Sequence, residues 1–375
     1  MQSFVPGHKV RQGSYQSFQP TLINRPWTLD DMEVQHLLSQ ADRQLGQLDM
    51  FSRYIPNIDL FISMHVAKEA TQSSRIEGTQ TRMEEVLLTA EDIPAERRDD
   101  WDEVHNYIAA MNHAIGALER LPFSSRLICE THRTLMRGVR GEHKQPGEFR
   151  TSQNWIGGAS ISDARFVPPV HTSIDELMSD LESFVHNDEI LLPDLLKIGL
   201  VHYQFETIHP FLDGNGRVGR LLITLYLVEK GILKSPVLYL SDFFERNRTL
   251  YYDNLTRVRE QGDIVQWLKF FLVGVIETAE SGIATFDAIL QLQKDVDDWV
   301  APLGSRAENA RKVVQALYER PVTDAERVAQ ATGLSLTSSY KLIADMEEIG
   351  ILSEITGAKR GRLYVFGRYL HLFTP

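Results

Sequence analysis

The stretch His209-Pro-Phe-Leu-Asp-Gly-Asn-Gly-Arg-Val-Gly-Arg220 is the most informative part of this 375-residue chain. Its small residues Gly214-Asn215-Gly216 allow successive backbone N–H groups to converge on an anion. A helix that starts there points its positive end at the same anion. Arg217 and Arg220 each offer a planar fork of donors for phosphate oxygens. The stretch therefore predicts a polyphosphate site at the start of a helix.

Two further side chains of this stretch supply chemistry. Asp213 is a hard oxygen ligand of the kind that binds Mg²⁺ beside phosphates. His209 is the only side chain in the stretch whose ordinary pKa lies near neutrality, so it is the candidate general base.

Three glycines of the stretch, Gly214, Gly216 and Gly219, also fit the dinucleotide pattern G-x-G-x-x-G. That pattern requires a strand immediately before it. The preceding apolar residues are spaced three or four apart instead: Leu195, Ile198, Val201, Phe205 and Ile208. This spacing is that of a helical face, and it disfavours a dinucleotide-binding fold.

The twelve residues match in type and order the signature H-P-F-x-[D/E]-G-N-G-R-x-x-R, so the chain resembles the Fic family. Fic proteins are mostly adenylyltransferases, which move AMP from ATP to a hydroxyl of a target protein. The resemblance implies a mainly α-helical fold with a small β-hairpin flap. It also implies ATP as substrate, Mg²⁺ as cofactor, and Ser, Thr or Tyr hydroxyls of target proteins, or of the chain itself, as acceptors.

The resemblance also assigns roles to individual residues. His209 deprotonates the acceptor hydroxyl, and Asp213 holds Mg²⁺ on the phosphates. Nucleotide binding falls to the residues that follow, and to one asparagine further along the chain: Gly214, Asn215, Gly216, Arg217, Val218, Gly219, Arg220 and Asn247.

A second segment resembles the Fic flap, a hairpin that docks the backbone of the target over the active site. Gly147–Arg150 is followed by Trp155, Ile156, Gly157 and Gly158. The glycine pair signals a turn, and Phe166–Pro169 suits an edge or extended segment. An edge strand can pair with an added backbone segment. An ordinary loop is the alternative for this segment.

A third segment, Ser73-Ser74-Arg75-Ile76-Glu77-Gly78, matches the inhibitory motif [S/T]-x-x-x-E-[G/N] of regulated Fic proteins. It ends a helical stretch at about residues 59–78, where Gly78 can terminate the helix. The resemblance gives Ser73, Glu77 and Gly78 a regulatory role, in which Glu77 pairs with Arg220 and restrains transfer. The alternative is a solvated surface glutamate.

Two other functions remain open. Glu77 could orient a water molecule that removes AMP from a modified protein, which is the reverse activity. The chain could instead be a DNA-binding regulator whose nucleotide site serves only as a sensor.

Composition limits the class of protein. A net charge of −12 argues against indiscriminate binding to nucleic acid or an anionic membrane. The single cysteine, Cys129, excludes an intramolecular disulfide and a cysteine-built zinc site. Residues 1–7 show no apolar signal segment, and the longest apolar runs are too short to span a bilayer. We expect a cytoplasmic protein with no membrane partner, and a homodimer is left open.

The pattern predicts three regions. Residues 1–100 form an N-terminal arm, extended to about residue 25, and a helical region that contains the inhibitory helix. Residues 101–300 form the Fic catalytic domain, and residues 305–375 form a winged helix-turn-helix domain.

The last region contains 10 Lys and Arg against 8 Asp and Glu. Its helices are expected at Ala307–Tyr318, Asp324–Thr332 and Ser335–Glu348, with a wing over Leu352–Phe366. DNA binding would place Ser338, Ser339 and Lys341 in the groove and the tip Gly357–Arg362 on phosphate. The small positive charge is a weak field for DNA, so docking to a protein is preferred.

Other notable residues have structural explanations. Glu206 and His209 form one E-x-x-H, but a di-metal site needs a second, which the sequence lacks. His202 is expected to be a hydrogen-bonded core residue. One buried helical face is expected to contain Trp101, His105, Tyr107 and Met111.

Overall fold

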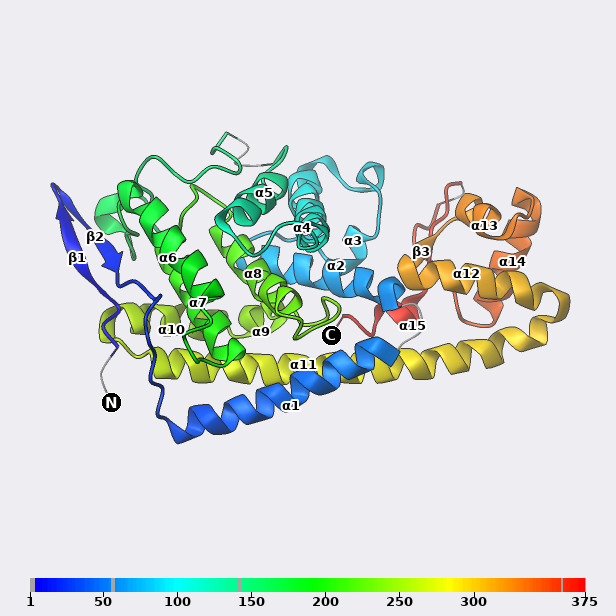
Figure 1. Cartoon of the computed structure of the whole chain (residues 1–375). Helices are drawn as coiled ribbons and strands as arrows, with labels where there is room; N and C mark the ends of the chain where they lie inside the picture. The colour runs from blue at the N-terminus through cyan, green and yellow to red at the C-terminus, as the bar shows by residue number, and fades with distance from the viewer. Residues whose placement is uncertain (1–3, 55–57, 140–142, 359, 375) are drawn as a thin grey trace.

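Helices build most of the protein, which is described by a computed structural model over residues 4–54, 58–139, 143–358 and 360–374 (Figure 1). The predicted mainly α fold is confirmed. Through residue 300 the helices are α1 (Met32–Tyr54), α2 (Ile58–Ile76), α3 (Met83–Val86), α4 (Arg98–Ala117), α5 (Ser125–Leu135), α6 (Ile174–His186), α7 (Asp194–Ile208), α8 (Asn215–Glu229), α9 (Ser241–Arg246), α10 (Arg248–Gln261) and α11 (Ile264–Val300).

Helix α7 lies at the centre of the core and leads directly into the 209–220 stretch. Every residue from Leu195 to Ile208 is buried, which fits a helix that is apolar on all sides. Helices α6, α8 and α11 pack around it. Gly199 permits the close approach of Leu268 and Phe271 from α11, and its carbonyl accepts a 2.9 Å hydrogen bond from Trp267. The site is therefore built on a rigid element.

His202 of α7 is the hydrogen-bonded core histidine that was expected. Its Nδ1 lies 2.9 Å from the carbonyl oxygen of Gly219, and its Nε2 lies 2.8 Å from the hydroxyl of Tyr251. A carbonyl can only accept, so Nδ1 carries the proton and Nε2 accepts from the tyrosine. The residue joins α7, α8 and α10.

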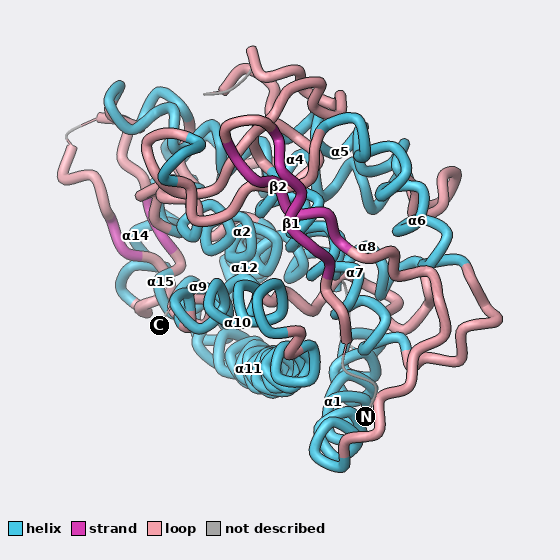
Figure 2. The backbone as a smooth tube through the Cα atoms, turned by 90° about the vertical axis from the view of Figure 1, so that its left-hand side faces the viewer, coloured by secondary structure: helices cyan, strands magenta, loops and turns pink. Residues whose placement is uncertain are grey.

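Helix α11 is the long spine of the molecule, and α1 runs alongside it (Figures 1 and 2). Asp263 caps its start by accepting a hydrogen bond from the backbone N–H of Gln266. Gly282 permits the close approach of α1, because a Cβ there would be 2.9 Å from Leu48 Cδ1. Among the described residues, no helix combines the length and apolar character needed to cross a bilayer.

The N-terminal arm was predicted to be extended, and it instead folds into an antiparallel hairpin. Strands β1 (Gly7–Gln12) and β2 (Tyr15–Pro20) pair from Gly7↔Pro20 to Gln12↔Tyr15. A two-residue Gly13-Ser14 turn joins them, and Gly13 has φ 62°. A glycine-serine pair between two extended runs is a hairpin signal that the sequence analysis overlooked.

The face of α4 differs in part from the expectation. Tyr107 and Met111 are fully buried, whereas Trp101 and His105 are only half buried. Trp101 donates a 2.9 Å hydrogen bond from its indole nitrogen to the carbonyl of Glu85, so it packs against the α3 segment at the edge of the core.

Beyond α11, a short 3-10 helix, η5 (Ala301–Arg306), leads into the C-terminal region. Its elements are α12 (Ala307–Glu319), β3 (Val322–Thr323), α13 (Ala325–Thr332), α14 (Leu336–Glu348), β4 (Ser353–Glu354), β5 (Tyr364–Val365) and α15 (Gly367–Leu370). The strands form an antiparallel sheet in the order β3-β5-β4. The helices agree with the expected ranges, while the strands of the expected wing have only two residues each.

Ser339 does not have the surface position expected of a DNA-contacting residue. Its side chain is fully buried and donates to the carbonyl of Ser335, because it lies on the inner face of α14. Lys359, part of the expected basic tip, lies outside the described residues.

The C-terminal region packs against α2. Phe61 of α2 lies 5.4 Å from the ring of Tyr318 and 6.3 Å from that of Tyr369, measured between centroids. Ser63 donates a 3.1 Å hydrogen bond to the carbonyl of Glu319. The expected inhibitory helix is thus supported from a region more than 240 residues further along the chain.

Candidate active site

The 209–220 stretch forms a tight loop between α7 and α8. His209 follows the last residue of α7 with φ 50°, and Gly214 precedes α8 with φ 75°. A left-handed conformation is uncommon for a residue other than glycine, and it often marks a functional position. The side chain of Asn215 fastens the loop by accepting from the N–H of Phe211 and donating to its carbonyl, each at 2.8 Å.

The anion site is expected at the start of α8 (Asn215–Glu229). Backbone N–H groups in the first turn of a helix have no partner within the helix. Because the Asn215 amide is engaged with Phe211, that residue can offer its backbone rather than its side chain. Val218 is buried in the core and likewise contributes only backbone. Arg217 and Arg220 are both nearly fully buried on this helix.

His209 is held as a neutral imidazole. Burial and the nearby guanidinium groups of Arg259 and Arg150 lower its pKa to about 3. The ring is therefore unprotonated at neutral pH and can accept a proton. Its Nδ1 is buried and has no hydrogen-bond partner among the described residues.

Arg150 ties the segment before the flap to the loop. Its guanidinium donates to the carbonyl of His209 at 3.0 Å, that of Ser152 at 3.1 Å and that of Pro169 at 2.6 Å. The side chain is 2% exposed, and burial lowers its pKa to about 10. The three carbonyls accept the hydrogen bonds of the buried guanidinium, which has no carboxylate partner among these contacts. The same bonds fix the backbone on both sides of the site.

Arg259 of α10 is a partly buried residue that the sequence analysis did not single out. It donates to the carbonyl of Glu206 and to the hydroxyl of Thr207, each at 3.1 Å. Its guanidinium lies 4.0 Å from the ring centroid of Phe166 in the flap. No local pattern marks it, because it reaches the site only through tertiary packing.

The carboxylate of Asp213 is partly exposed and lies just before the start of α8. One oxygen lies 3.0 Å from Lys144 Nζ, and the other accepts from the backbone N–H of Gly214 at 2.7 Å and lies 3.8 Å from Arg217. Burial raises its pKa, but these contacts outweigh burial and hold the pKa below its usual value.

Mg²⁺ commonly binds through one or two carboxylates plus substrate phosphates. Within the described ranges, no group of three or more His, Cys, Asp or Glu side chains could hold a metal by itself. One ionised carboxylate beside a phosphate site fits a metal that arrives with its nucleotide.

Glu77 is placed by the way α2 ends. The N–H of Thr79 donates to the carbonyl of Ser74 at 3.2 Å, and that of Gly78 donates to the carbonyl of Arg75 at 3.0 Å. This pair of bonds is a Schellman motif, and Gly78 supplies the positive φ of 108° that it needs. Glu77 is the capping residue, one position beyond the helix.

Glu77 pairs with Arg220 as expected. Its Oε1 lies 2.7 Å from Arg220 Nη2, which also donates to the carbonyl of Ser73, while Nε donates to the Ser73 hydroxyl, both at 2.9 Å. Burial alone would lower the pKa of Arg220, but Glu77 and the other acidic neighbours raise it above its ordinary value. A Cβ at position 216 would overlap the Glu77 carboxylate, so Gly216 makes this approach possible.

Two more carboxylates lie beside the arginines. Glu103 of α4 lies 3.3 Å from Arg217, and both side chains are almost completely buried. Glu206 of α7 packs against Gly219, where a Cβ would overlap it. Burial raises the pKa of Glu206 to about 7. The two arginines expected to bind phosphate are thus balanced by carboxylates in this state.

The flap is a single antiparallel bridge between Ile156 and Phe166. Gly157 and Gly158 form its turn with φ 69° and 79°, and Trp155 is 42% exposed. The neighbouring segment was expected to offer a free edge. The N–H of Phe18 in β2 instead donates to the carbonyl of Val167 at 2.9 Å, so the N-terminal hairpin covers that side.

Asn247 lies at the junction of α9 and α10. Its amide nitrogen donates to the carbonyl of Phe243 at 3.0 Å, which ends α9. Its contact with a nucleotide remains a prediction.

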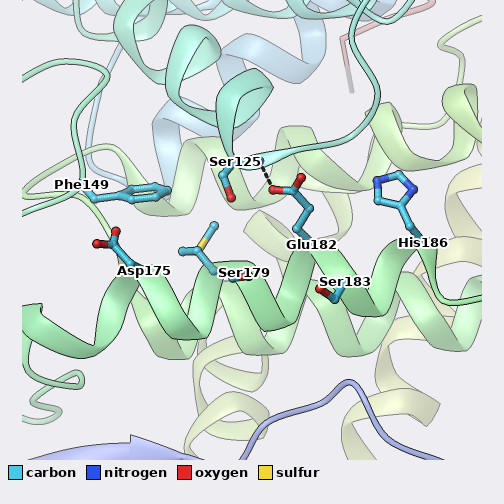
Figure 3. Close-up of a pocket in the computed structure, with 8 residues that line it drawn as sticks. Ser125, Phe149, Asp175, Ser179, Glu182, Ser183 and His186 are labelled. Atoms are coloured by element: carbon cyan, nitrogen blue, oxygen red, sulfur yellow. Dashed lines mark hydrogen bonds between the residues drawn. The ribbon is translucent and has the colours of Figure 1, made fainter.

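An open hollow lies between α5 and α6 (Figure 3). It encloses about 760 Å³, including space open to solvent. Glu182 accepts a 2.8 Å hydrogen bond from the backbone of Ser125 there. Phe149 lines the hollow and packs on Phe211, so the hollow borders the back of the loop.

Comparison with protein families agrees with the geometry. The model described as Fic/DOC family N-terminal matches residues 35–116, and that described as Fic/DOC family matches residues 122–227. Together they span about half of the chain, and the chain belongs to the Fic/DOC family.

Two curated proteins with similar sequences share the name protein adenylyltransferase Fic. A protein adenylyltransferase Fic from Aedes aegypti is 31% identical over 194 residues, which are 51% of this chain and 35% of the relative. One from Drosophila erecta is 27% identical over 256 residues, 65% of this chain and 48% of the relative. The chain therefore matches less than half the length of these relatives.

Solved structures share the fold. A Fic family protein from Desulfovibrio desulfuricans G20 superposes with a TM-score of 0.59 at 20% identity, covering 91% of this chain and 98% of that one. A Fic domain containing signaling protein from Bacteroides thetaiotaomicron VPI-5482 gives 0.52 at 19% identity, covering 67% and 95%.

Proposed function

We propose that this chain is a protein adenylyltransferase that moves AMP from ATP to a hydroxyl of a target protein or of itself, and that Glu77 restrains it. The observation that carries the proposal is the pairing of Glu77 with Arg220 across the intact 209–220 loop. The names of the curated relatives support the same reaction.

The loop supplies the parts for in-line transfer. The neutral His209 accepts the proton of the acceptor hydroxyl, whose oxygen forms a bond to the α-phosphorus. The bond from that phosphorus to the bridging oxygen breaks, and pyrophosphate leaves. The first turn of α8 and Arg217 bind the phosphates, and Arg220 anchors the γ-phosphate. Asp213 would hold Mg²⁺, which neutralises phosphate charge when bound.

Glu77 opposes this arrangement. While it pairs with Arg220, the carboxylate occupies the place of the γ-phosphate and uses the charge that should bind it. A nucleotide bound productively must break a partly buried contact and lie beside a second anion, which costs on the order of 1–4 kcal/mol. Removal of the Glu77 charge should therefore release the site.

The decisive experiment measures self-labelling with [α-³²P]ATP. Glu77→Gln keeps the shape and removes the charge, and we expect labelling to rise about ten- to a thousandfold, since each 1.36 kcal/mol is a factor of ten. Glu84→Gln, on the exposed face of α3, is the matched control and should behave like the parent. Adding His209→Ala to Glu77→Gln should abolish labelling.

Equal labelling by parent and Glu77→Gln would remove the regulatory role of Glu77. The reverse activity would instead be assigned to the chain if Glu77→Gln no longer releases AMP from pre-labelled protein and shows no gain in labelling.

A further inference from the structure

The carboxylate proposed to hold the metal already has a cation beside it. Lys144 Nζ lies 3.0 Å from Asp213 Oδ2, and the two side chains are 42% and 37% exposed. Arg217 approaches the other oxygen at 3.8 Å. Lys144 comes from the loop between α5 and the flap, well outside the 209–220 stretch.

This contact is part of a connected structure. The backbone N–H of Gly147 donates to His132 Nδ1 at 2.8 Å, and His132 Nε2 lies 3.0 Å from the carbonyl oxygen of Asp213. Because Nδ1 accepts, Nε2 must carry the proton and donate it to that carbonyl. The His132 imidazole therefore joins the loop that carries Lys144 to the backbone of Asp213, the residue that Lys144 contacts.

Packing fixes the His132 ring in addition to these two hydrogen bonds. The ring also stacks on Phe211 at 3.8 Å between centroids with an interplanar angle of 5°. Near this anchor, Gln145 has φ 55°, so the backbone beside Lys144 adopts a conformation that is uncommon for a residue other than glycine.

We propose that Lys144 is a built-in counter-ion of Asp213, which occupies the metal position in the resting state and is displaced when a divalent cation arrives with its nucleotide. The inference rests on the metal role given to Asp213 in the proposed function. An ammonium 3.0 Å from the oxygen fills the space that a cation at about 2.1 Å and its ligands require. The two cations also repel each other.

The contact between Lys144 and Asp213 favours metal that arrives together with nucleotide over metal that arrives alone. Without nucleotide, Lys144 neutralises Asp213, so a free divalent cation gains little there. The phosphates of a nucleotide bring enough negative charge to accept both the metal and the released ammonium. Lys144 therefore discriminates against metal that arrives without nucleotide, and its removal should relax this discrimination.

The test measures metal binding directly. Mn²⁺ is titrated into the full chain carrying Glu77→Gln, with and without α,β-methylene-ATP, and free Mn²⁺ is followed by electron paramagnetic resonance. We expect Lys144→Met to tighten Mn²⁺ binding about two- to fivefold, the scale of an exposed ion pair, and more strongly without nucleotide. The control, Lys294→Met on an exposed face of α11, should change nothing. The Mg²⁺ concentration for half-maximal self-labelling should fall in parallel.

The outcomes separate the two proposals. If Asp213→Asn loses Mn²⁺ but Lys144→Met binds it no more tightly than the parent, the counter-ion role is wrong and the metal site stands. Weaker Mn²⁺ binding by Lys144→Met also overturns the counter-ion role. If Asp213→Asn binds Mn²⁺ as well as the parent does, the metal role itself fails. Thermal melts of each variant check that it is folded.

Discussion

At the scale of single residues, the position of Glu77 depends on the backbone that follows it. Two hydrogen bonds and the positive φ of Gly78 end α2 so that the carboxylate faces Arg220. Gly78 has open space where a Cβ would lie, so only its backbone conformation restricts the choice of residue. A substitution at Gly78 therefore tests how Glu77 restrains the site without removing any charged side chain.

We expect Gly78→Ala to raise self-labelling, because alanine disfavours the left-handed backbone by about 1–2 kcal/mol and the end of α2 must change to relieve it. Self-labelling and urea unfolding should be measured together. Gly357→Ala, also at positive φ with open space where its Cβ would lie, but in an exposed loop of the C-terminal region, is the control for strain alone. Unchanged labelling in a destabilised Gly78→Ala would show that Glu77 does not depend on this turn.

A second prediction concerns His65 of α2. Burial and Lys68 lower its pKa to about 3, and its ring packs on Phe286 and Phe373. The unfolded chain binds a proton near pH 6.5 and the folded chain does not, so stability is lost as pH falls below 6.5. The loss is about 1 kcal/mol at pH 5.5.

His65→Phe should therefore reduce the fall in unfolding free energy between pH 7.5 and 5.5 by about 1 kcal/mol. Chemical denaturation at both pH values measures this difference. His36→Phe, on the exposed face of α1, should not alter it. An equal fall in parent and His65→Phe would mean that His65 is protonated in the folded chain.

At the scale of elements, the C-terminal end of α7 and the flap are joined through Arg259 of α10. Its hydrogen bonds occupy carbonyl and hydroxyl groups in the last turn before His209, and its charge lies against Phe166. Among the described residues the two sides of the flap meet in one bridge, so its position also depends on Arg259, on the N-terminal hairpin and on the hydrogen bond from Arg150 to Pro169.

We expect Arg259→Met to lower self-labelling about tenfold or more while nucleotide affinity stays within about twofold. Methionine fills the space but leaves buried acceptors unpaired, which costs about 1–3 kcal/mol. Labelling and nucleotide titration, both in the Glu77→Gln chain, separate the two effects. Arg257→Met, half exposed on the same helix, is the control. An equal loss of nucleotide affinity would place Arg259 in the nucleotide site instead.

The same elements show what the sequence could reveal. The 209–220 loop, the end of α2 and the glycine turn of the flap could be predicted, because each depends on residues adjacent in the chain. Arg259, Arg150 and Lys144 act across long sequence separations, and no local spacing marks an arginine or lysine that binds a distant carbonyl or carboxylate. Ser339 was misplaced because helical phase decides which face it occupies.

At the scale of the whole molecule, the two ends of the chain flank the site. The N-terminal hairpin contacts the flap, and the C-terminal region packs its aromatic residues on α2. Its winged-helix character and any docking partner remain proposals. Its contact with α2 nevertheless gives a distant region a physical route to the helix that holds Glu77.

We expect Tyr318→Ala to lower the unfolding free energy by about 3 kcal/mol and to raise self-labelling. The ring lies 5.4 Å from Phe61 and 5.1 Å from Tyr369, so its loss weakens the support of α2 on that side. Tyr340→Ala, 51% exposed on α14, is the control and should alter neither property. Loss of stability with parental labelling would separate the C-terminal region from regulation.

From the way α2 ends, we also expect self-labelling to respond to heat. The last turn of a helix is among the parts of a fold that open with the least free energy, and warming favours the open form. Each such fraying event carries Glu77 away from Arg220 without unfolding the rest of the chain. The restrained chain should therefore speed up with temperature more steeply than one lacking the Glu77 charge, so that the two rates converge in a warm cell and diverge in a cold one.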